Sequence, residues 1–410
     1  MVCFMAVGLS KISELLPVKG VQVSACIAGI YKEKREDLAL ISFGSNSNCA
    51  AVFTQNAFCA APVIVAKKHI KEGKPNYCLI NSGNANAGLG ERGIEATMDV
   101  CRHLADYTGA SVENVLPFST GVIAEPLPVK KIKNAIPTLV DILIADAWSH
   151  VANAILTTDT LAKGISKKID LPDGEITITG IAKGSGMIRP KMATMLAYIA
   201  TDADIDEILL QSLLSDVVED SFNCISIDGD TSTNDACFMV ATGESDVAKI
   251  NNINEGSGLL FRNALLEVCI YLAQAIVRDG EGATKFISID VIDGASKEEC
   301  REVALTVANS PLVKTAFFAS DPNWGRILAA IGRTELSALD VGSISISLND
   351  VKIVERGQRA ESYTEAKGQH VMDQEEIIVH ISMGRGSASA VIWTCDLSHE
   401  YIRINSEYRS

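Results

Sequence analysis

The sequence is poor in the residues that usually build metal centres and histidine-based active sites. Only six histidines occur among 410 residues, and no two of them lie four apart, as a zinc-binding helix requires. The eleven cysteines are scattered singly, with no pair at metal-ligand or redox spacing. We therefore expect no metal site, and we expect the thiols to be buried as small apolar groups.

An excess of positive charge and a long apolar run are also missing. The 36 basic residues face 51 acidic ones, and the resulting formal net charge of −15 disfavours nucleic acid or an anionic membrane as a partner. No apolar run reaches the roughly 18 residues of a membrane span. Residues 1–9 lack the basic flank of a signal peptide. We expect a cytoplasmic globular protein that acts on a small molecule.

Three loops look like phosphate or calcium motifs, but each lacks a residue that its motif requires. The loop at Gly184 has Arg189 where a dinucleotide fingerprint needs its third glycine. Residues 280–285 lack the spacing and the lysine–hydroxyl pair of a phosphate loop. The aspartate-rich loop at 228–235 has Thr233 and Met239 where a calcium loop needs glycine and glutamate. Nucleotide and calcium sites are therefore not expected.

Short apolar runs between polar turns predict strands, and apolar residues at helical spacing predict helices between them. The strands at 77–80 and 114–118 each lead into a polar loop, which is where sites are commonly built. Asp204 and Glu207 predict a capping pair for the helix that follows. No linker or repeat marks a domain boundary. The expected strands are 37–43, 62–66, 77–80, 114–118, 175–179, 285–291, 341–348, 376–383 and 387–394, and the expected helices are 93–107, 146–156 and 259–277.

The segment from Gly184 to Thr194 is the most informative part of the sequence. A glycine-rich stretch and Pro190 deliver the hydroxyl of Thr194 to the mouth of an apolar strand, where it can attack the carbonyl of Ala193. The resulting ester would be hydrolysed by water, which exposes Thr194 as an N-terminal residue. Its α-amine, with a pKa of about 7.7 to 8.0, would then serve as the base that histidine does not provide. A loop that enters a core strand also needs glycine and proline, so a structural reading stays open.

Acyl transfer through a hydroxyl also needs donors for the oxyanion of each tetrahedral intermediate. One such donor is typically worth about 2.7 to 4 kcal/mol of barrier. Thr120 and Gly121 offer a hydroxyl and an unobstructed backbone N–H at the end of a predicted strand. The sequence alone does not tell whether they face Thr194.

Short polar and glycine-rich segments follow one another in a distinctive order from about Leu16 to the C-terminus. They are 81–87, 119–123, 157–160, 182–188, 192–196, 228–235, 279–285, 321–326 and 404–409. In this order they resemble the ornithine acetyltransferases of arginine biosynthesis, also called bifunctional glutamate N-acetyltransferases (the ArgJ family). So many matching segments are hard to obtain by chance.

The resemblance implies an enzyme that moves acetyl from N-acetylornithine to glutamate through an acetyl-Thr194 intermediate. It implies cleavage between Ala193 and Thr194 into an alpha chain, 1–193, and a beta chain, 194–410, which stay together as a heterotetramer with two copies of each. The implied fold is α+β, a sandwich of mixed β-sheets flanked by helices of the DmpA/ArgJ-like kind. No cofactor is implied. Bifunctional members also use acetyl-CoA as a co-substrate, and the sequence leaves that use open.

Matching positions also imply roles for single residues. Thr194 is implied as the nucleophile, with Thr120 and Gly121 as oxyanion stabilisers. A substrate with carboxylate and amine ends suits a cation such as Lys183 and an anion such as Glu281. The implied substrate-binding positions are Thr157, Lys183, Thr194, Glu281, Asn405 and Ser410; Asp228, Asp230, Asn234, Asp235 and Arg326 either support the site or form turns and salt bridges. The chain departs from the family pattern at Ala162, where proline is usual, and at Gly88, where cysteine is common.

Two other classes of function stay open. An N-terminal-threonine amidase or aminopeptidase would release acetate, or cleave peptides, without needing glutamate. A binding or scaffold protein on an enzyme-like fold would keep the bond between Ala193 and Thr194 intact. Ornithine release that depends on glutamate separates the transferase from the hydrolase, and the mass of the purified chain identifies the scaffold.

Overall fold

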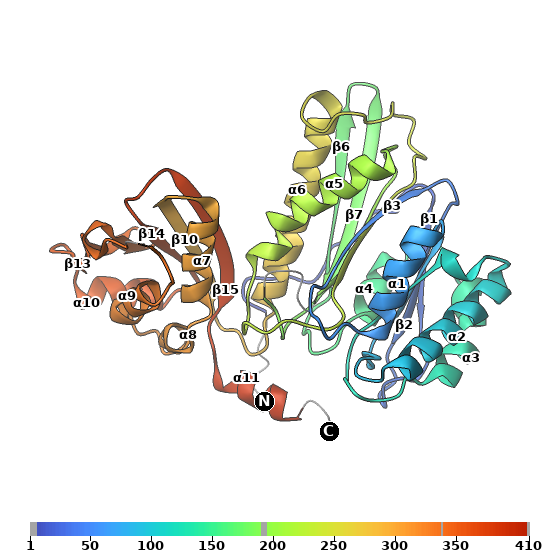
Figure 1. The fold of residues 1–410 in the computed structure, drawn as a ribbon, viewed down its shortest axis with the longest axis horizontal. Coiled ribbons are helices and arrows are strands. Elements are labelled where there is room, and N and C mark those ends of the chain that lie inside the picture. Colours follow the sequence, from blue (N-terminus) through green and yellow to red (C-terminus); the bar gives the residue numbers. More distant parts are fainter. Residues whose placement is uncertain (1–5, 190–194, 338, 408–410) are drawn as a thin grey trace. The chain divides into compact units, whose positions relative to one another are not determined.

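The computed structural model describes residues 6–189, 195–337 and 339–407, which form two compact units (Figure 1). The large unit comprises Lys11–Asn223 and Asp230–Ile276. The small unit comprises the described residues of Met1–Ser10, Cys224–Gly229 and Val277–Ser410. The chain passes between the units more than once, because residues 224–229 of the small unit interrupt the large one.

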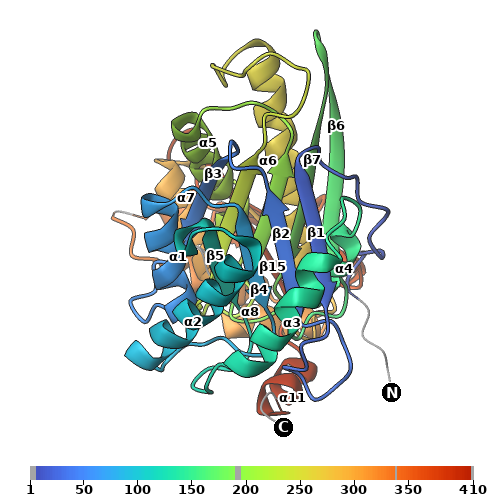
Figure 2. The same cartoon turned by 90° about the vertical axis from the view of Figure 1, so that its right-hand side faces the viewer.

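The first sheet of the large unit has the strand order β1-β2-β4-β5, in which β4 and β5 are parallel and the other pairs antiparallel. Its strands are β1 (Val21–Cys26), β2 (Leu38–Phe43), β4 (Tyr77–Asn81) and β5 (Val115–Ser119), and the helices that cover one face are α2 (Glu91–Thr108) and α3 (Val129–Asp141) (Figure 2). Leu38 and Leu40 pack against these helices. Ala39 and Ile41 belong to the core on the opposite face. Strand β2 is apolar at every position except Ser42, because both of its faces are covered.

The second sheet of the large unit has the strand order β3-β9-β8-β7-β6. Its central strands β8 and β9 run parallel, and the remaining neighbours are antiparallel. Every residue of β8 and β9 is buried, which accounts for their continuous apolar sequences. The strands are β3 (Asn48–Phe53), β6 (Lys163–Leu171), β7 (Gly174–Lys183), β8 (Leu196–Thr201) and β9 (Ala236–Ala241).

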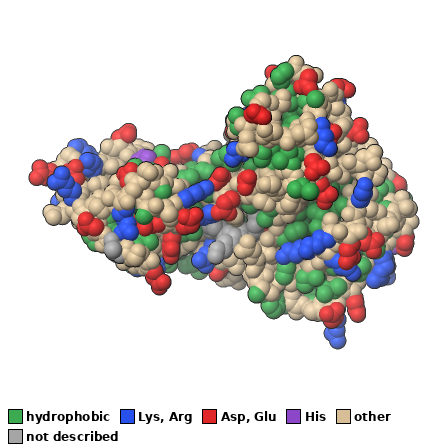
Figure 3. Space-filling model, turned by 45° about the horizontal axis from the view of Figure 1, so that its top comes forward, with side chains coloured by type: hydrophobic (Ala, Val, Ile, Leu, Met, Phe, Trp, Pro, Cys, Tyr) green, Lys and Arg blue, Asp and Glu red, His purple; other side chains and the backbone are tan. Residues whose placement is uncertain are grey.

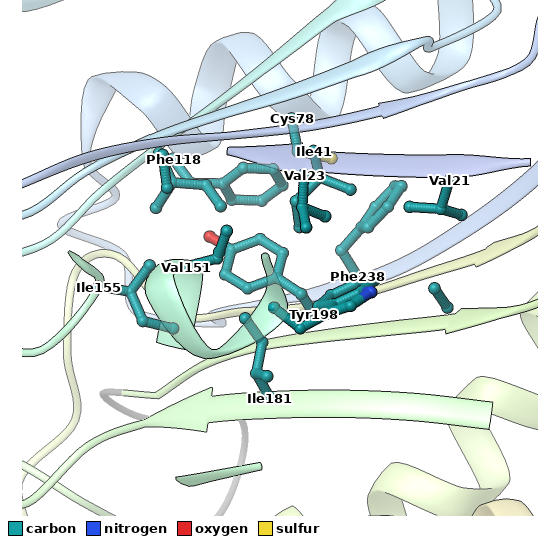
Figure 4. Packing of buried hydrophobic residues seen from close by; sticks show 14 of the residues in the cluster. Val21, Val23, Ile41, Cys78, Phe118, Val151, Ile155, Ile181, Tyr198 and Phe238 are labelled. Carbon is teal, nitrogen blue, oxygen red and sulfur yellow. The ribbon is translucent and has the colours of Figure 1, made fainter. Parts of the chain in front are cut away.

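The two sheets pack face to face around a shared apolar core (Figure 4). Phe118 from the first sheet meets Tyr198 from the second edge to face, with ring centroids 5.3 Å apart. Phe43 and Phe238 stack at 5.8 Å across the same interface. Helices α1 (Ala61–Glu72) and α4 (Trp148–Ala154) contribute further apolar side chains. The expected sandwich of mixed sheets flanked by helices is therefore confirmed.

Helices α5 (Glu207–Glu219) and α6 (Gly256–Arg278) lie outside the second sheet (Figure 1). A methyl group added to Gly180 of β7 would lie 3.0 Å from Leu272 and 3.1 Å from Val268, so α6 packs closely on this strand. By length and composition α6 would also be long and apolar enough to cross a membrane, a test that buried core helices pass as well. The ten cysteines in the described part of the chain are free thiols, and most are buried, as expected.

The small unit is built on one mixed sheet with the strand order β13-β12-β11-β14-β10-β15. Its strands are β10 (Phe286–Gly294), β11 (Ser345–Leu348), β12 (Val351–Glu355), β13 (Gln358–Arg359), β14 (Glu376–Ser382) and β15 (Ala388–Cys395). Its helices are α7 (Lys297–Ala308), α8 (Pro311–Phe318), α9 (Trp324–Gly332), α10 (Glu365–Met372) and α11 (His399–Glu407). One face of α7 is buried, and this helix packs on β10 and β15.

Three details of the predicted elements are wrong. Residues 62–66 belong to helix α1, because Pro62 occupies its first turn and a five-residue apolar run fits a buried helix as well as a strand. The cap of α5 is Asp206, whose side chain accepts from the backbone N–H of Ile208 3.0 Å away, and not Asp204. The expected strand at 341–348 begins as a 3₁₀ turn, with only its second half in β11.

Candidate active site

The polar loops that follow β4 and β5 lie side by side, because parallel neighbouring strands end at the same edge of a sheet. The backbone N–H of Thr120 donates to the Asn81 carbonyl over 3.0 Å, and the Ala85 N–H donates to the Val122 carbonyl over 2.9 Å. The Ser119 hydroxyl also donates to the Asn81 side chain, over 2.6 Å. The two loops therefore form one hydrogen-bonded layer around Thr120.

Gly121 occupies a position where no other residue fits. Its φ is +132°, and a Cβ atom there would lie 2.3 Å from the carbonyl carbon of Gly83 and 2.5 Å from the nitrogen of Asn84. The neighbouring loop is backbone at this point and has no flexible side chain that could move away. The Gly121 N–H makes no hydrogen bond to any described residue, so it is free to donate to a ligand.

Lys183, the last residue of β7, reaches from the second sheet to the first. Its ammonium donates to the Thr120 hydroxyl over 3.1 Å, and both side chains are buried. The hydroxyl oxygen accepts this bond, and its hydrogen is donated to no residue within the described ranges. Thr120 can therefore donate outward while Lys183 polarises it, and the Gly121 N–H is adjacent. These groups suit the stabilisation of a developing negative charge.

Thr157 lies in the loop before β6, where the carboxylate of Asp159 organises the backbone. Asp159 accepts from the Thr157 N–H at 3.1 Å, from the Gly184 N–H at 2.7 Å and from the Lys163 ammonium at 2.7 Å. Burial opposes ionisation of this carboxyl, but the charges of Lys163 and Lys183 outweigh it and hold the pKa of Asp159 well below its usual range. The loop with Thr157 is thereby tied to the end of β7.

Ala193 and Thr194, the predicted cleavage site and nucleophile, lie outside the described residues. The chain is described again from Met195, whose carbonyl accepts from the Ala236 N–H at 3.1 Å. Leu196 then opens β8 and pairs with Lys183 across the ladder to β7. The strand that follows Thr194 therefore begins beside the lysine that contacts Thr120.

Asn234 links a third loop to the two around Thr120. Its side-chain amide donates to the Ala85 carbonyl over 2.7 Å and to the Ser119 carbonyl over 2.9 Å. The side chain is buried, and the residue lies just before β9. The sequence left its role open between site support and turn formation, and the structure gives it contacts to both loops of the first sheet.

In the small unit, Glu281 and Asn405 are brought together. The side-chain amide of Asn405 donates to a carboxylate oxygen of Glu281 over 2.7 Å. The Asp396 carboxylate anchors the loop that contains Glu281, because it accepts hydrogen bonds from the backbone N–H groups of Thr284 and Lys285, both at 2.8 Å. Ser410, the remaining predicted substrate position, lies outside the described residues.

Two further residues that the sequence proposed as supports also belong to the small unit. Asp228 accepts from the Tyr401 hydroxyl at 3.2 Å, which connects its loop to helix α11. The Arg326 guanidinium donates to the Leu312 carbonyl at 2.7 Å and to the Thr315 hydroxyl at 3.3 Å, so it braces α8. Its observed contacts are therefore structural.

The large unit has an open hollow of about 700 Å³ between α1, α5 and β3. Apolar side chains form much of its lining, with Lys67 and Lys71 on one side and Glu207 on the other. Figure 3 shows apolar and charged side chains exposed together on this unit's surface. Of the predicted site residues that the structure describes, none lines this hollow. No group of three potential metal ligands occurs among the described side chains.

Comparison with known proteins decides the family. The family model for ArgJ matches residues 22–410. The chain belongs to the ArgJ family. The arginine biosynthesis bifunctional protein ArgJ of Pseudomonas fluorescens is 52% identical over 409 residues, which are 99% of this chain and 100% of that protein. The protein of the same name from Methylococcus capsulatus is 52% identical over 398 residues, 97% of each chain.

Solved structures include similar chains. The arginine biosynthesis bifunctional protein argJ of Bacillus halodurans has a TM-score of 0.49 at 33% identity, covering 52% of this chain and 98% of that one. An ornithine acetyltransferase from Mycobacterium tuberculosis, complexed with ornithine, has a TM-score of 0.37 at 29% identity, covering 43% and 95%. Membership of the ArgJ family rests on the sequence match over nearly the whole chain.

In this ArgJ-family chain, sequence reasoning singled out Thr157 and Lys183 but missed Asp159 and Lys163. An aspartate in a threonine-rich turn usually binds its own backbone, and Asp159 does so at Thr157. Its second partner, Gly184, lies 25 residues further along the chain. The available signal was the Asp159–Lys163 spacing, which is also common among exposed ion pairs.

Proposed function

We propose that this ArgJ-family protein transfers acetyl from N-acetylornithine to glutamate through an acetyl-Thr194 intermediate, and so produces ornithine and N-acetylglutamate. The observation that carries the proposal is the contact of Lys183 with Thr120 beside Gly121, at the edge where β8 begins two residues after Thr194. This contact supplies the donors that acyl transfer requires, next to a strand that begins two residues after the proposed nucleophile.

The first proposed reaction is cleavage of the chain itself. The Thr194 hydroxyl attacks the Ala193 carbonyl, and the peptide bond breaks as an ester forms between Ala193 and the Thr194 oxygen. Water hydrolyses this ester, which leaves a carboxylate on Ala193 and a free α-amine on Thr194. Alpha chain 1–193 and beta chain 194–410 remain associated, two copies of each, as a heterotetramer.

The exchange then proceeds in two half-reactions. The α-amine of Thr194 takes the proton of the Thr194 side-chain hydroxyl. The hydroxyl oxygen then attacks the acetyl carbonyl of N-acetylornithine, and ornithine is released. The amine of glutamate attacks the acetyl ester and regenerates the hydroxyl. Thr120 and Gly121 donate to the oxyanion in both half-reactions, each worth about 2.7 to 4 kcal/mol by analogy with known oxyanion donors.

The family resemblance assigns the positions that bind the charged ends of the substrate. Charge complementarity supports a cation, Lys183, and an anion, Glu281, among them. Acetyl-CoA is an additional acetyl donor for glutamate in this proposal, no cofactor is used, and the protein acts in the cytoplasm. The substrate-binding set is Thr157, Lys183, Thr194, Glu281, Asn405 and Ser410.

The decisive experiment compares the purified wild-type protein with Thr194→Ala. Wild type should yield two fragments, the second beginning at Thr194, and should release ornithine only when glutamate is present. Thr194→Ala should remain one chain of 43.8 kDa and give no exchange. Thr138→Ala, at an exposed position on α3, should be cut and active like wild type.

Other outcomes identify the alternatives. A cut and active Thr194→Ala protein would refute the proposal. Release of acetate without glutamate would indicate the threonine amidase, and an intact wild-type chain would favour the scaffold. Glutamate acetylation by acetyl-CoA in the absence of N-acetylornithine tests the second acetyl donor.

A further inference from the structure

Asp159 is a fully buried carboxylate that joins two segments of the large unit. One oxygen accepts from the Gly184 N–H and from the Lys163 ammonium, both at 2.7 Å. The other accepts from the Thr157 N–H at 3.1 Å. The carboxylate thus contacts the loop before β6 and the residue that follows Lys183.

The bond to Gly184 fixes the point where β7 ends. Gly184 has a φ of +153°, in the region that favours glycine, and the chain bends at residues 185–187. Thr158 reinforces this bend, because its hydroxyl lies 2.7 Å from the Ser185 hydroxyl. The direction in which the Lys183 side chain leaves the strand therefore depends on a segment that Asp159 holds.

Electrostatic attraction also links Asp159 to Lys183. Burial opposes ionisation of Asp159, and the charge of Lys163, together with a smaller contribution from the charge of Lys183, outweighs it and lowers the pKa of this acid. The attraction is mutual, so Asp159 favours a charged ammonium at Lys183, inside a site where burial would otherwise disfavour it. That ammonium donates to Thr120 over 3.1 Å.

A simpler explanation is that Asp159 only neutralises Lys163. The two side chains are fully buried, and leaving either ion without its partner in such a place is strongly destabilising. The bonds from Thr157 and Gly184 do not involve Lys163, however, and they are the ones that connect the carboxylate to the site.

We propose that Asp159 is a positioning residue for the acetyl exchange, which holds the end of β7 and the Lys183 ammonium where that ammonium donates to Thr120. The inference rests on the proposed function. Asp159 acts through Lys183 and Thr120 on the oxyanion, which exists only along the reaction path. Its loss should therefore lower kcat more than it changes KM.

Neutralising Asp159 and Lys163 together separates the two explanations. Asp159→Asn/Lys163→Gln removes both charges and so leaves neither ion buried alone. We expect a folded protein, by circular dichroism and gel filtration, whose kcat for exchange is at least tenfold below wild type and whose KM values stay within threefold. Each single variant leaves one buried ion without its partner and should be less stable than the double variant. For the folded protein, Asp159→Asn should lose as much kcat as the double variant, and Lys163→Gln should keep kcat within threefold of wild type.

A matched control is Asp37→Asn. Asp37 is also buried and also accepts from backbone N–H groups, those of Ala28, Ile30 and Tyr31. This change should lower stability while kcat of the folded protein stays within threefold of wild type. It shows how much a buried, loop-organising carboxylate matters to turnover in general.

Each outcome bears on the proposal. A double variant with wild-type kcat overturns it, because Asp159 would then be needed only for Lys163. Failure of both Asp159 variants to fold also overturns it, because Asp159 would then serve folding alone. A folded but uncut Asp159 variant supports it, because the proposal extends the same donors to the tetrahedral intermediate of self-cleavage. Absence of exchange in wild type would instead refute the proposed function.

Discussion

At Gly121 the backbone of one loop lies against the backbone of another, and there is no room for a side chain between them. The closest atoms belong to Gly83 and Asn84, which are main-chain atoms of the loop after β4. The same contact directs the Gly121 N–H, which is one of the two proposed oxyanion donors. The close contact between the two loops and the proposed donor role of the Gly121 N–H thus both require that residue 121 has no Cβ atom.

Gly121→Ala should therefore reduce exchange at least a hundredfold, because displacing one oxyanion donor typically costs about 10² to 10³ in kcat. Steady-state kinetics on the folded variant measures the loss. Gly332→Ala is the control, since a Cβ there meets nothing within 4 Å and its φ is not positive. An alanine at 121 with near-normal kcat would mean that this N–H is not a donor in the reaction.

The sequence contained much of the site at the level of single residues. Thr120 and Gly121 follow a predicted strand, and Lys183 stands between the predicted strand 175–179 and the Gly184 loop, although the observed strand β7 extends to Lys183 itself. Their contact could not, because it joins residues 63 apart on two different sheets. Asp159 was missed for the same reason, since its importance depends on which distant backbone group reaches it.

At the scale of elements, the strands covered on both faces were the easiest to predict. β8 and β9 are buried throughout and have apolar sequences that only a buried strand or helix can carry, and polar turns limit their length. The reading of 62–66 as a strand failed because tertiary packing decides such short runs, and here it selected helix α1. The cap at Asp206 was misplaced because two aspartates in that turn could both serve.

The loops before β9 and after β4 and β5 form one cooperative element through Asn234. Asn234→Ala removes both amide bonds and leaves the Ala85 and Ser119 carbonyls buried without these donors. We expect a loss of about 1 to 3 kcal/mol in the free energy of unfolding, measured by urea titration. Asn251→Ala, at an exposed loop position, should change it by less than about 0.5 kcal/mol. Equal effects of the two substitutions would contradict the bridging role.

At the scale of the whole molecule, the core between the two sheets contains a polar atom with no evident use. The Tyr198 hydroxyl makes no hydrogen bond to a described residue, although its ring packs against Phe118. Tyr198→Phe keeps that packing and removes the hydroxyl. Because an unpaired buried hydroxyl is unfavourable, the variant should equal wild type or exceed it by about 1 kcal/mol near neutral pH.

The same substitution should reveal a pH dependence. Burial raises the pKa of Tyr198 well above its ordinary value. Below about pH 10 the phenol is neutral in both states; above it the unfolded chain ionises first, so wild type loses stability. The advantage of phenylalanine should grow by up to about 1.4 kcal/mol per pH unit, measured by urea titration at pH 8 and pH 11. A constant difference would contradict the assigned burial.

The division of the chain into two compact units could not be anticipated from composition. Residues 224–229 leave the large unit for six positions without a proline-rich or charged linker. The boundary at 193–194 proposed from chemistry also differs from the boundary between the units. The proposed cleavage site therefore does not separate the two compact units from each other.

The strand order of the second sheet determines how slowly the two proposed fragments can dissociate from each other. β9 and β8 would belong to the fragment after the cut, and they lie between β3 on one side and β7 on the other, both from the fragment before it. Six residue pairs join each of these boundaries. Because β8–β9 is hydrogen-bonded on both sides to strands of the other fragment, fragments can exchange between molecules only if the sheet unfolds. In a mixture with an inactive variant, each wild-type molecule would keep both of its own halves, and activity would follow the wild-type share for the lifetime of the fold.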